Sequence, residues 1–136
     1  MIKNLAIQSL KRKPVINIFG NDYPTKDGTC IRDYIHVSDL ADIHVKGIEY
    51  LEKNNKSFTL NCGYGKGYSV LQIVKIFKTI KKNLKIIFSN KRPGDVAEVY
   101  ADTKKFKKLL KWKAKYNDIN KIIKSAIKWE KKLNSI

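Results

Sequence analysis

The stretch Ile31-Arg-Asp-Tyr-Ile-His-Val-Ser-Asp-Leu-Ala41 contains the pattern that decides the fold. Its first half places apolar residues at positions 31, 35 and 37, which allows a β-strand over residues 31–37. Its second half begins a helix, for which Ser38 or Asp39 can be the N-cap. One apolar face of that helix follows from the helical spacing of Leu40, Ile43, Gly47, Ile48 and Leu51.

The same alternation of strand and helix extends in both directions from this stretch. Before it, Val15-Ile-Asn-Ile-Phe19 predicts a strand, and the first dozen residues have a helical pattern. After it, the sequence predicts strands over 58–61 and 84–89 and a helix over 70–80, where Ser69 and Gln72 form a capping box. Two further helices are expected, one capped by Thr103 and one running from Asp118 to Leu133. The fold class is therefore α/β.

Length and composition fit one soluble domain that spans residues 1–136. The chain has 136 residues, of which 43% are apolar, so a packed core is possible without stabilising cross-links. It contains no run of about 18 apolar residues and no cleavable leader, which predicts a cytoplasmic protein without a membrane span. The two cysteines, Cys30 and Cys62, form no disulfide framework and are expected as reduced thiols.

The net charge of +17 raises the alternative of a module that binds nucleic acid or an anionic membrane surface. Of the 29 basic residues, however, 26 are lysines. A protein that reads nucleic acid is expected to use more arginine for bidentate contacts to phosphate and guanine. The composition therefore favours a solvated lysine-rich surface and directs attention to the three arginines, Arg12, Arg32 and Arg92.

The loop Gly63-x-Gly65-x-Gly67 lies between a predicted strand and a predicted helix, where a phosphate cradle would be placed. The spacing of a dinucleotide-binding loop is not met, because Tyr68 stands three residues after Gly65. The expected acidic residue at the end of the following strand is also missing. These differences favour a structural turn over a phosphate-binding loop.

No catalytic or metal-binding set emerges from the remaining motifs. Tyr100 and Lys104 have the spacing of a Tyr-x-x-x-Lys pair, but Tyr100 would lie before the helix that Thr103 caps. His36 and His44 lack companions at metal-ligand spacing. The sequence thus predicts no catalytic residue and no metal ligand within this chain.

Five segments together resemble one enzyme family, the UDP-glucose 4-epimerases, which are extended short-chain dehydrogenases/reductases. The most specific of them runs from Phe19 to Ala41 and includes Phe-Gly-Asn-Asp-Tyr-Pro-Thr and Ile-Arg-Asp-Tyr-Ile-His-Val. The others follow in the family's order: Asn61-Cys-Gly-Tyr-Gly-Lys-Gly-Tyr-Ser-Val70, Arg92-Pro-Gly-Asp95, Tyr100-Ala-Asp102 and Leu110-Lys-Trp112. The resemblance covers nearly the whole chain from residue 15 onward.

This resemblance implies a binding site for the UDP part of a nucleotide sugar. In the family, Asn17 and Phe19 would flank the uracil, Arg32 and Arg92 would reach the pyrophosphate, and Asp95 would accept from the ribose hydroxyls. Tyr34 and Val70 would line the same pocket. Guanidinium groups suit a diphosphate and a carboxylate suits a diol, so the residue types agree with these roles.

The resemblance extends only to the C-terminal, substrate-binding part of the family. The N-terminal Rossmann half, which carries NAD and the catalytic residues, has no counterpart in the sequence. Val99 also stands where some family members carry an aromatic residue near the nucleotide. The implied function is the interconversion of UDP-glucose and UDP-galactose, with NAD and the redox step supplied by a separate Rossmann half or within a homodimer. A fragment of a related nucleotide-sugar epimerase or dehydratase is the alternative.

Overall fold

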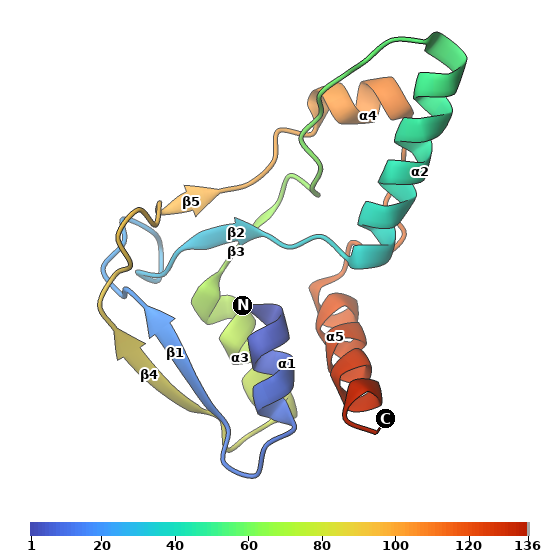
Figure 1. The fold of residues 1–136 in the computed structure, drawn as a ribbon. Helices are drawn as coiled ribbons and strands as arrows, with labels where there is room; N and C mark the ends of the chain where they lie inside the picture. The colour runs from blue at the N-terminus through green and yellow to red at the C-terminus, as the bar shows by residue number, and fades with distance from the viewer. Residues whose placement is uncertain (136) are drawn as a thin grey trace.

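The computed structural model describes residues 1–135, which form five helices and five short strands (Figure 1). In chain order these elements are α1 (Ile2–Ser9), β1 (Val15–Phe19), β2 (Ile31–Asp33), α2 (Val37–Asn54), β3 (Gly67–Ser69), α3 (Val70–Ile80), β4 (Lys85–Ser89), β5 (Glu98–Val99), α4 (Lys104–Leu110) and α5 (Ile119–Leu133). The α/β class predicted from the sequence is confirmed.

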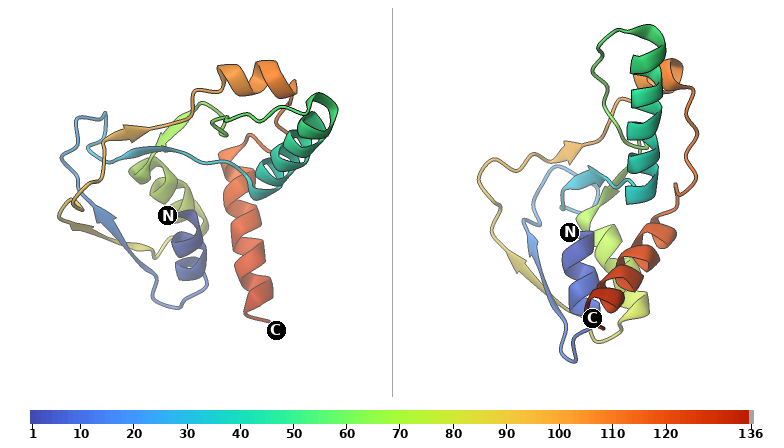
Figure 2. Two further views of the ribbon diagram at one scale, coloured as in Figure 1. Left: turned by 45° about the horizontal axis from the view of Figure 1, so that its top comes forward. Right: turned by 45° about the vertical axis from the view of Figure 1, so that its right-hand side comes forward.

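The strands form two small sheets. In the first, β1 and β4 are parallel, with Val15 opposite Lys85 and Phe19 opposite Ser89. In the second, β2 is central, antiparallel to β3 and parallel to β5. Helices α1 and α3 lie beside the first sheet, and α5 packs against α1 (Figure 2). The three residues of β2 are fewer than the sequence pattern predicted, because the chain after Asp33 turns toward α2.

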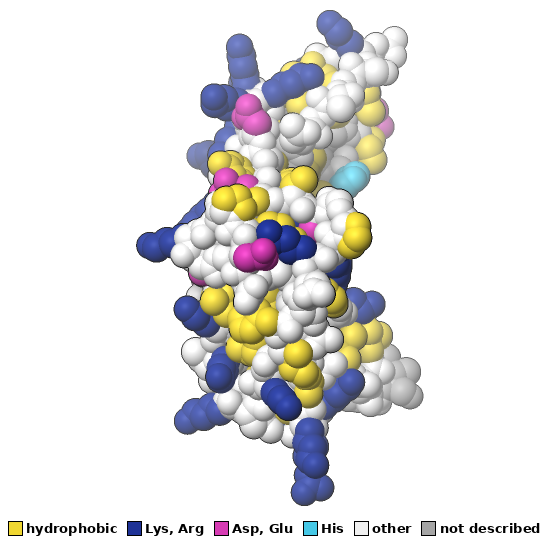
Figure 3. All heavy atoms as spheres, turned by 90° about the vertical axis from the view of Figure 1, so that its left-hand side faces the viewer, with side chains coloured by type: hydrophobic (Ala, Val, Ile, Leu, Met, Phe, Trp, Pro, Cys, Tyr) yellow, Lys and Arg dark blue, Asp and Glu magenta, His cyan; other side chains and the backbone are white. Residues whose placement is uncertain are grey.

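Lysine side chains on the face visible in Figure 3 are not gathered in one stripe. On the face shown in Figure 3 they project at the margins, with apolar and acidic side chains between them. A solvated surface needs no binding partner for these charges. This distribution is consistent with the interpretation of the net charge as general surface charge.

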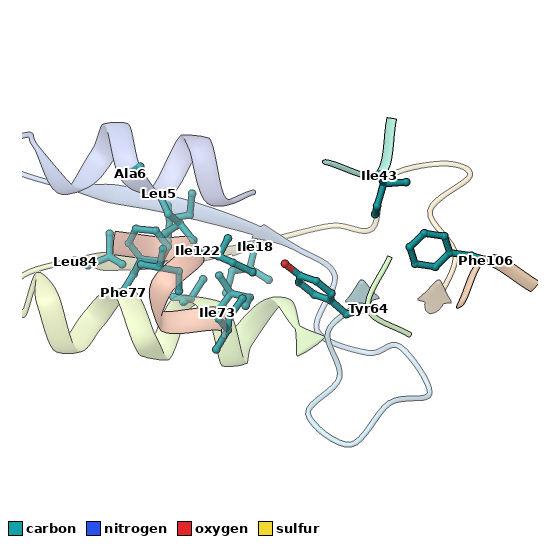
Figure 4. Close-up of a cluster of buried hydrophobic side chains, with 14 of the residues drawn as sticks. Leu5, Ala6, Ile18, Ile43, Tyr64, Ile73, Phe77, Leu84, Phe106 and Ile122 are labelled. Carbon is teal, nitrogen blue, oxygen red and sulfur yellow. The ribbon is translucent and has the colours of Figure 1, made fainter. Parts of the chain in front are cut away.

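The hydrophobic core is built where α1, α3 and α5 meet the inner face of β1. Figure 4 shows Leu5 and Ala6 of α1 close to Ile18, Ile73, Phe77 and Ile122. Along β1, Ile16 and Ile18 are buried, whereas Asn17 between them is exposed. This alternation follows from the two-residue period of a strand and leaves the opposite face of β1 free to line a site.

The starts of α3, α4 and α5 agree with the sequence predictions, and the start of α2 differs. Ser69 and Gln72 make the predicted capping box at α3, and Asp118 caps α5 by accepting from the Asn120 N–H. The prediction for α2 is wrong, because His36 Nδ1 accepts from the Ser38 N–H and the helix begins at Val37. At α4, Thr103 is the N-cap residue as predicted, although its side chain makes no capping hydrogen bond.

The strand predicted over residues 58–61 does not form, and β5 was not predicted. The segment around Phe58 has no regular secondary structure, and no strand lies beside it in residues 1–135. A strand forms only where its backbone groups pair with those of a neighbouring strand. A pattern of β-propensity gives no information about whether such a neighbour is present. Conversely, the two residues of β5 are a strand only because they lie beside β2.

Asp39 is the most completely buried carboxyl group that the structure describes, with none of its surface exposed. Its Oδ2 accepts from the Tyr64 hydroxyl at 2.7 Å and from the Tyr116 N–H at 2.9 Å. Its Oδ1 accepts from the Lys115 N–H at 3.2 Å. Burial, and then the bond to Asp39, raise the pKa of Tyr64. One side chain thus joins the start of α2, the glycine-rich loop and the segment before α5.

None of the helices in residues 1–135 is both long and apolar enough to cross a membrane.

We expect Asp39→Asn to lower the free energy of unfolding by about 2–3 kcal/mol, because the amide keeps one acceptor oxygen but turns its NH2 group toward at least one backbone N–H that also donates. Urea unfolding followed by circular dichroism measures the change. The matched control is Glu49→Gln, which removes a charge from an exposed pair with Lys46 and should change stability by less than about 0.5 kcal/mol. Equal losses for the two variants would contradict the role given to Asp39.

Candidate functional site

A cavity of about 800 Å³ lies between α1, β1, β2 and the loop that connects β4 to β5. All seven residues that the family resemblance assigned to nucleotide-sugar binding line it: Asn17, Phe19, Arg32, Tyr34, Val70, Arg92 and Asp95. They come from five different parts of the chain. The fold therefore brings together residues that are up to 78 positions apart in the sequence, from Asn17 to Asp95.

The strand β1 contributes its outward-facing side to the cavity. Because Ile16 and Ile18 point into the core, the side chains of Asn17 and Phe19 lie on the other face. The parallel partner β4 and the hydrogen bond from the Gly20 N–H to the Ser89 carbonyl hold the end of β1 in place. A rigid strand thus positions an amide and an aromatic ring at the cavity wall.

Arg32 lies at the cavity with its guanidinium fixed at two points. Nη1 donates to the Ile31 carbonyl at 2.8 Å, and Nη2 lies 3.4 Å from Asp95 Oδ1. The two side chains remain 27% and 35% exposed. An ion pair this open to water is weakly stabilising, so an incoming anion can compete with Asp95 for the guanidinium.

The second arginine of the cavity stacks on an aromatic ring. The Arg92 Cζ lies 3.8 Å from the centroid of the Phe19 ring. Arg92 belongs to the exposed loop between β4 and β5, where the Asp95 N–H donates to the Arg92 carbonyl at 3.2 Å. This turn places the Arg92 and Asp95 side chains at one cavity. Cation–π contact leaves the hydrogen-bond donors of the guanidinium free.

Tyr34 presents a buried hydroxyl that has no hydrogen-bond partner among the described residues. Burial raises the pKa of Tyr34 to about 12, so the group is protonated at neutral pH. Its side chain also lines a second, more apolar cavity of about 900 Å³ between α1, α5 and the residues that join β2 to α2. A buried hydroxyl without a partner is costly, which makes Tyr34 a donor available to a ligand.

Sequence reasoning missed three polar or polarisable residues of the cavity wall, Asn4, Gln8 and Cys30. Asn4 and Gln8 stand four residues apart on α1 and therefore share one helix face. Gln8 Oε1 accepts from the Val15 N–H at 3.3 Å and so ties α1 to the start of β1. The four-residue spacing of Asn4 and Gln8 could have shown from the sequence that they share a helix face. Only the tertiary structure shows which element that face contacts.

The glycine-rich loop is a structural turn, as the sequence favoured. The N–H groups of Tyr64 and Gly65 donate to the two carboxylate oxygens of Asp33, at 3.2 Å and 2.9 Å. The Ala101 N–H also reaches Asp33, at 3.4 Å. An internal carboxylate thus occupies the position that a phosphate would need, so this loop does not fit the dinucleotide NAD.

Tyr100 lies outside helix α4, with an exposed side chain. It therefore cannot share a helical face with Lys104, and the Tyr-x-x-x-Lys spacing is a coincidence here. Among the described residues, no group of three His, Cys, Asp or Glu side chains is placed to hold a metal ion.

Comparison with known proteins agrees with the family resemblance. The family model described as GDP-mannose 4,6 dehydratase matches residues 1–126. A UDP-glucose 4-epimerase of Azospirillum brasilense is 41% identical over 134 residues, which is 98% of this chain and 38% of the relative. One from Bacillus subtilis is 45% identical over 115 residues, 84% of this chain and 33% of the relative.

Solved structures show the same relationship in three dimensions. A UDP-glucose 4-epimerase from Stenotrophomonas maltophila, solved with bound NAD and formylated UDP-arabinopyranose, superimposes with a TM-score of 0.86 at 36% identity. The match covers 98% of this chain and 39% of that one. A UDP-Glc/GlcNAc 4-epimerase from Campylobacter jejuni gives a TM-score of 0.84 at 40% identity, over 96% of this chain and 40% of the other.

The coverage shows which part of the family fold the chain represents. It spans 33% and 38% of the two sequence relatives and about 40% of the two solved structures. The structure neighbours are NAD-binding extended short-chain dehydrogenases/reductases, and the matched piece is C-terminal. The chain therefore belongs to the GDP-mannose 4,6 dehydratase family and corresponds to the C-terminal part of its UDP-glucose 4-epimerases.

Proposed function

We propose that residues 1–136 act as one unit that binds the UDP part of a UDP-sugar for a UDP-glucose 4-epimerase. The observation that carries this proposal is the convergence of all seven expected residues on one cavity. The cavity volume of about 800 Å³ suits a ligand of nucleotide-sugar size. The relatives named UDP-glucose 4-epimerase support UDP-glucose and UDP-galactose as the substrates.

The residues that line the cavity would contact three parts of the ligand: the uracil, the diphosphate and the ribose. Asn17 and Phe19 on β1 would contact the uracil, with the ring of Phe19 against the base and the amide of Asn17 at its polar edge. Arg32 and Arg92 would contact the diphosphate, which supplies the anion that suits two guanidinium groups. Asp95 would accept hydrogen bonds from the ribose, while Tyr34 and Val70 enclose the ligand.

Binding would exchange internal contacts for contacts with the ligand. The diphosphate would replace Asp95 beside Arg32, and the freed carboxylate would then turn to the ribose hydroxyls. The uracil would compete with the Arg92 guanidinium for the Phe19 ring, since the two lie 3.8 Å apart without ligand. In the complex, Arg32 and Arg92 would both face the diphosphate, and the Asp95 carboxylate would exchange its ion pair for hydrogen bonds to the ribose hydroxyls.

The redox step of epimerisation belongs to the part of the family fold outside this chain. When bound, NAD would supply the hydride acceptor and donor for this step, and solved UDP-glucose 4-epimerases from Stenotrophomonas maltophila and Brucella ovis contain NAD. The residues described here provide no dinucleotide cradle, because Asp33 occupies the glycine-rich loop. We propose that a Rossmann half or a homodimer partner supplies NAD, in the cytoplasm, where Cys30 and Cys62 remain free thiols.

Calorimetric titration with UDP-glucose at about physiological ionic strength tests the site. Arg32→Ala and Arg92→Ala should each weaken binding by about 10-fold to 100-fold, because each removes charge-assisted hydrogen bonds to the diphosphate. Arg12→Ala is the matched control, since Arg12 lies outside the cavity and should leave the affinity unchanged. Failure of the folded chain to bind UDP-glucose would contradict the proposal, and preference for GDP or dTDP would indicate a related epimerase or dehydratase.

The hydroxyl of Tyr34 gives a second prediction. Tyr34→Phe should leave the thermal midpoint of the free chain unchanged or higher, because the hydroxyl has no partner to lose. It should weaken binding of UDP-glucose about 5-fold to 10-fold, because a ligand acceptor then lacks its donor. Tyr64→Phe is the comparison: it removes bonds to Asp39 and His36 and should lower the midpoint. Calorimetry gives both quantities, and full affinity in Tyr34→Phe would exclude the hydroxyl as a ligand contact.

A further inference from the structure

Three side-chain amides line the cavity that contains Arg32 and Arg92. Asn17 comes from β1, whereas Asn4 and Gln8 come from one face of α1, which packs beside β1. The two amides of α1 have no part in the function proposed above. An amide carries both donors and an acceptor, which are the groups that recognise the polar edge of a base.

The order of residues along β1 separates these amides from the phosphate-binding end of the cavity. Phe19 stacks on Arg92 at one end of the strand, and Gln8 is hydrogen-bonded to Val15 at the other end. Asn17 lies between them, on the same strand face as Val15 and Phe19. Two residues, or about 7 Å along a strand, separate Phe19 from Asn17. A base that stacks on Phe19 therefore has its far edge at the amides when its diphosphate lies at the arginines.

The amide of Gln8 is held in one orientation. Its Oε1 accepts from the Val15 N–H at 3.3 Å, and a backbone N–H needs an oxygen rather than an NH2 group as its partner. The structure shows no acceptor for Gln8 Nε2 within residues 1–135. Gln8 thus presents its NH2 donor to the cavity while its oxygen is in use. The side chains of Asn4 and Asn17 are exposed and can turn either way.

Uracil and cytosine differ at the edge that would face this donor. Uracil, like thymine, carries an acceptor oxygen at C4, whereas cytosine carries an NH2 donor there. The Gln8 NH2 group complements the oxygen. Against cytosine it would leave two donors facing one another, which costs the desolvation of both. A fixed donor at this place therefore separates uracil from cytosine, and does not separate uracil from thymine.

We propose that Gln8 is a specificity-determining residue of the UDP-sugar site, and that it selects uracil over cytosine by donating from Nε2 to the uracil O4. The inference rests on the proposed function, because it needs the diphosphate at Arg32 and Arg92. Asn17 turns its side-chain oxygen to the uracil N3–H. The hydrogen bond from Val15 holds Gln8 in place before the ligand binds, so binding does not have to order this side chain.

Gln8→Glu tests the donor, because the two side chains have the same shape and a carboxylate oxygen can still accept from the Val15 N–H. It replaces the NH2 group by an acceptor, which suits the cytosine NH2 group. Calorimetric titration at about pH 7.5, where the glutamate is ionised, compares UDP-glucose with CDP-glucose. The unchanged chain should bind UDP-glucose at least about 10-fold more tightly, and Gln8→Glu should lower that ratio by about 10-fold or more. Repulsion of the diphosphate by the new charge affects both ligands and leaves the ratio unchanged.

Asn120→Asp is the matched control, because it makes the same change from amide to carboxylate at an exposed residue of α5 outside the cavity. It should leave the ratio unchanged. A second variant, Gln8→Met, keeps the length of the side chain without its donor and should bring the two affinities within about 3-fold of each other.

An unchanged ratio in Gln8→Glu, or an equal loss of affinity for both ligands in Gln8→Met, would overturn the role of Gln8 in selection and leave it only the structural bond to Val15. UDP-sugar binding would still stand in that case. A folded chain that binds neither nucleotide sugar would overturn the proposed function and this inference together, so the two failures are distinguishable.

Discussion

The structure depends most on the burial of one carboxylate, Asp39, which makes no ion pair within residues 1–135. Its three donors come from the glycine-rich loop and from the chain before α5, so the parts of the molecule that surround α2 are fixed relative to one another. A buried charge is tolerated only when hydrogen bonds satisfy its oxygens, which makes the arrangement of these three segments mutually dependent. The Tyr64 hydroxyl, in turn, accepts from the His36 N–H at the start of α2.

A second carboxylate, Asp33, organises the loop that sequence patterns associate with phosphate binding. Because Asp33 accepts from Tyr64 and Gly65, the loop is held by the strand that also carries Arg32. Adjacent residues on β2 point to opposite faces, so Asp33 turns toward the loop while Arg32 turns toward the cavity. The hydrogen bonds of Asp33 on one face of β2 thus help to position Arg32 on the other face.

The cavity and the exposed side of helix α2 are two different kinds of surface. The cavity groups are charged or polar and are already paired in part, as Arg32 is with Asp95 and Arg92 with Phe19. On the exposed side of α2, the apolar side chains of Val37, Val45 and Ile48 are uncovered within the described chain. Polar groups whose internal partners can be exchanged suit a ligand that binds reversibly. An exposed apolar face is typical of a stable protein interface.

A family resemblance named seven of the residues that line the cavity, and the sequence by itself determined the α/β class, the capping box of α3 and the strand β1. Those features follow from local propensity, helix caps and linear motifs, which are properties of neighbouring residues. The tertiary structure alone decided that Gln8 supports β1, that His36 rather than Ser38 caps α2, and that residues 58–61 stay unpaired. Each of these depends on a group distant in the sequence or on the absence of a neighbouring strand, and local patterns carry no information about either.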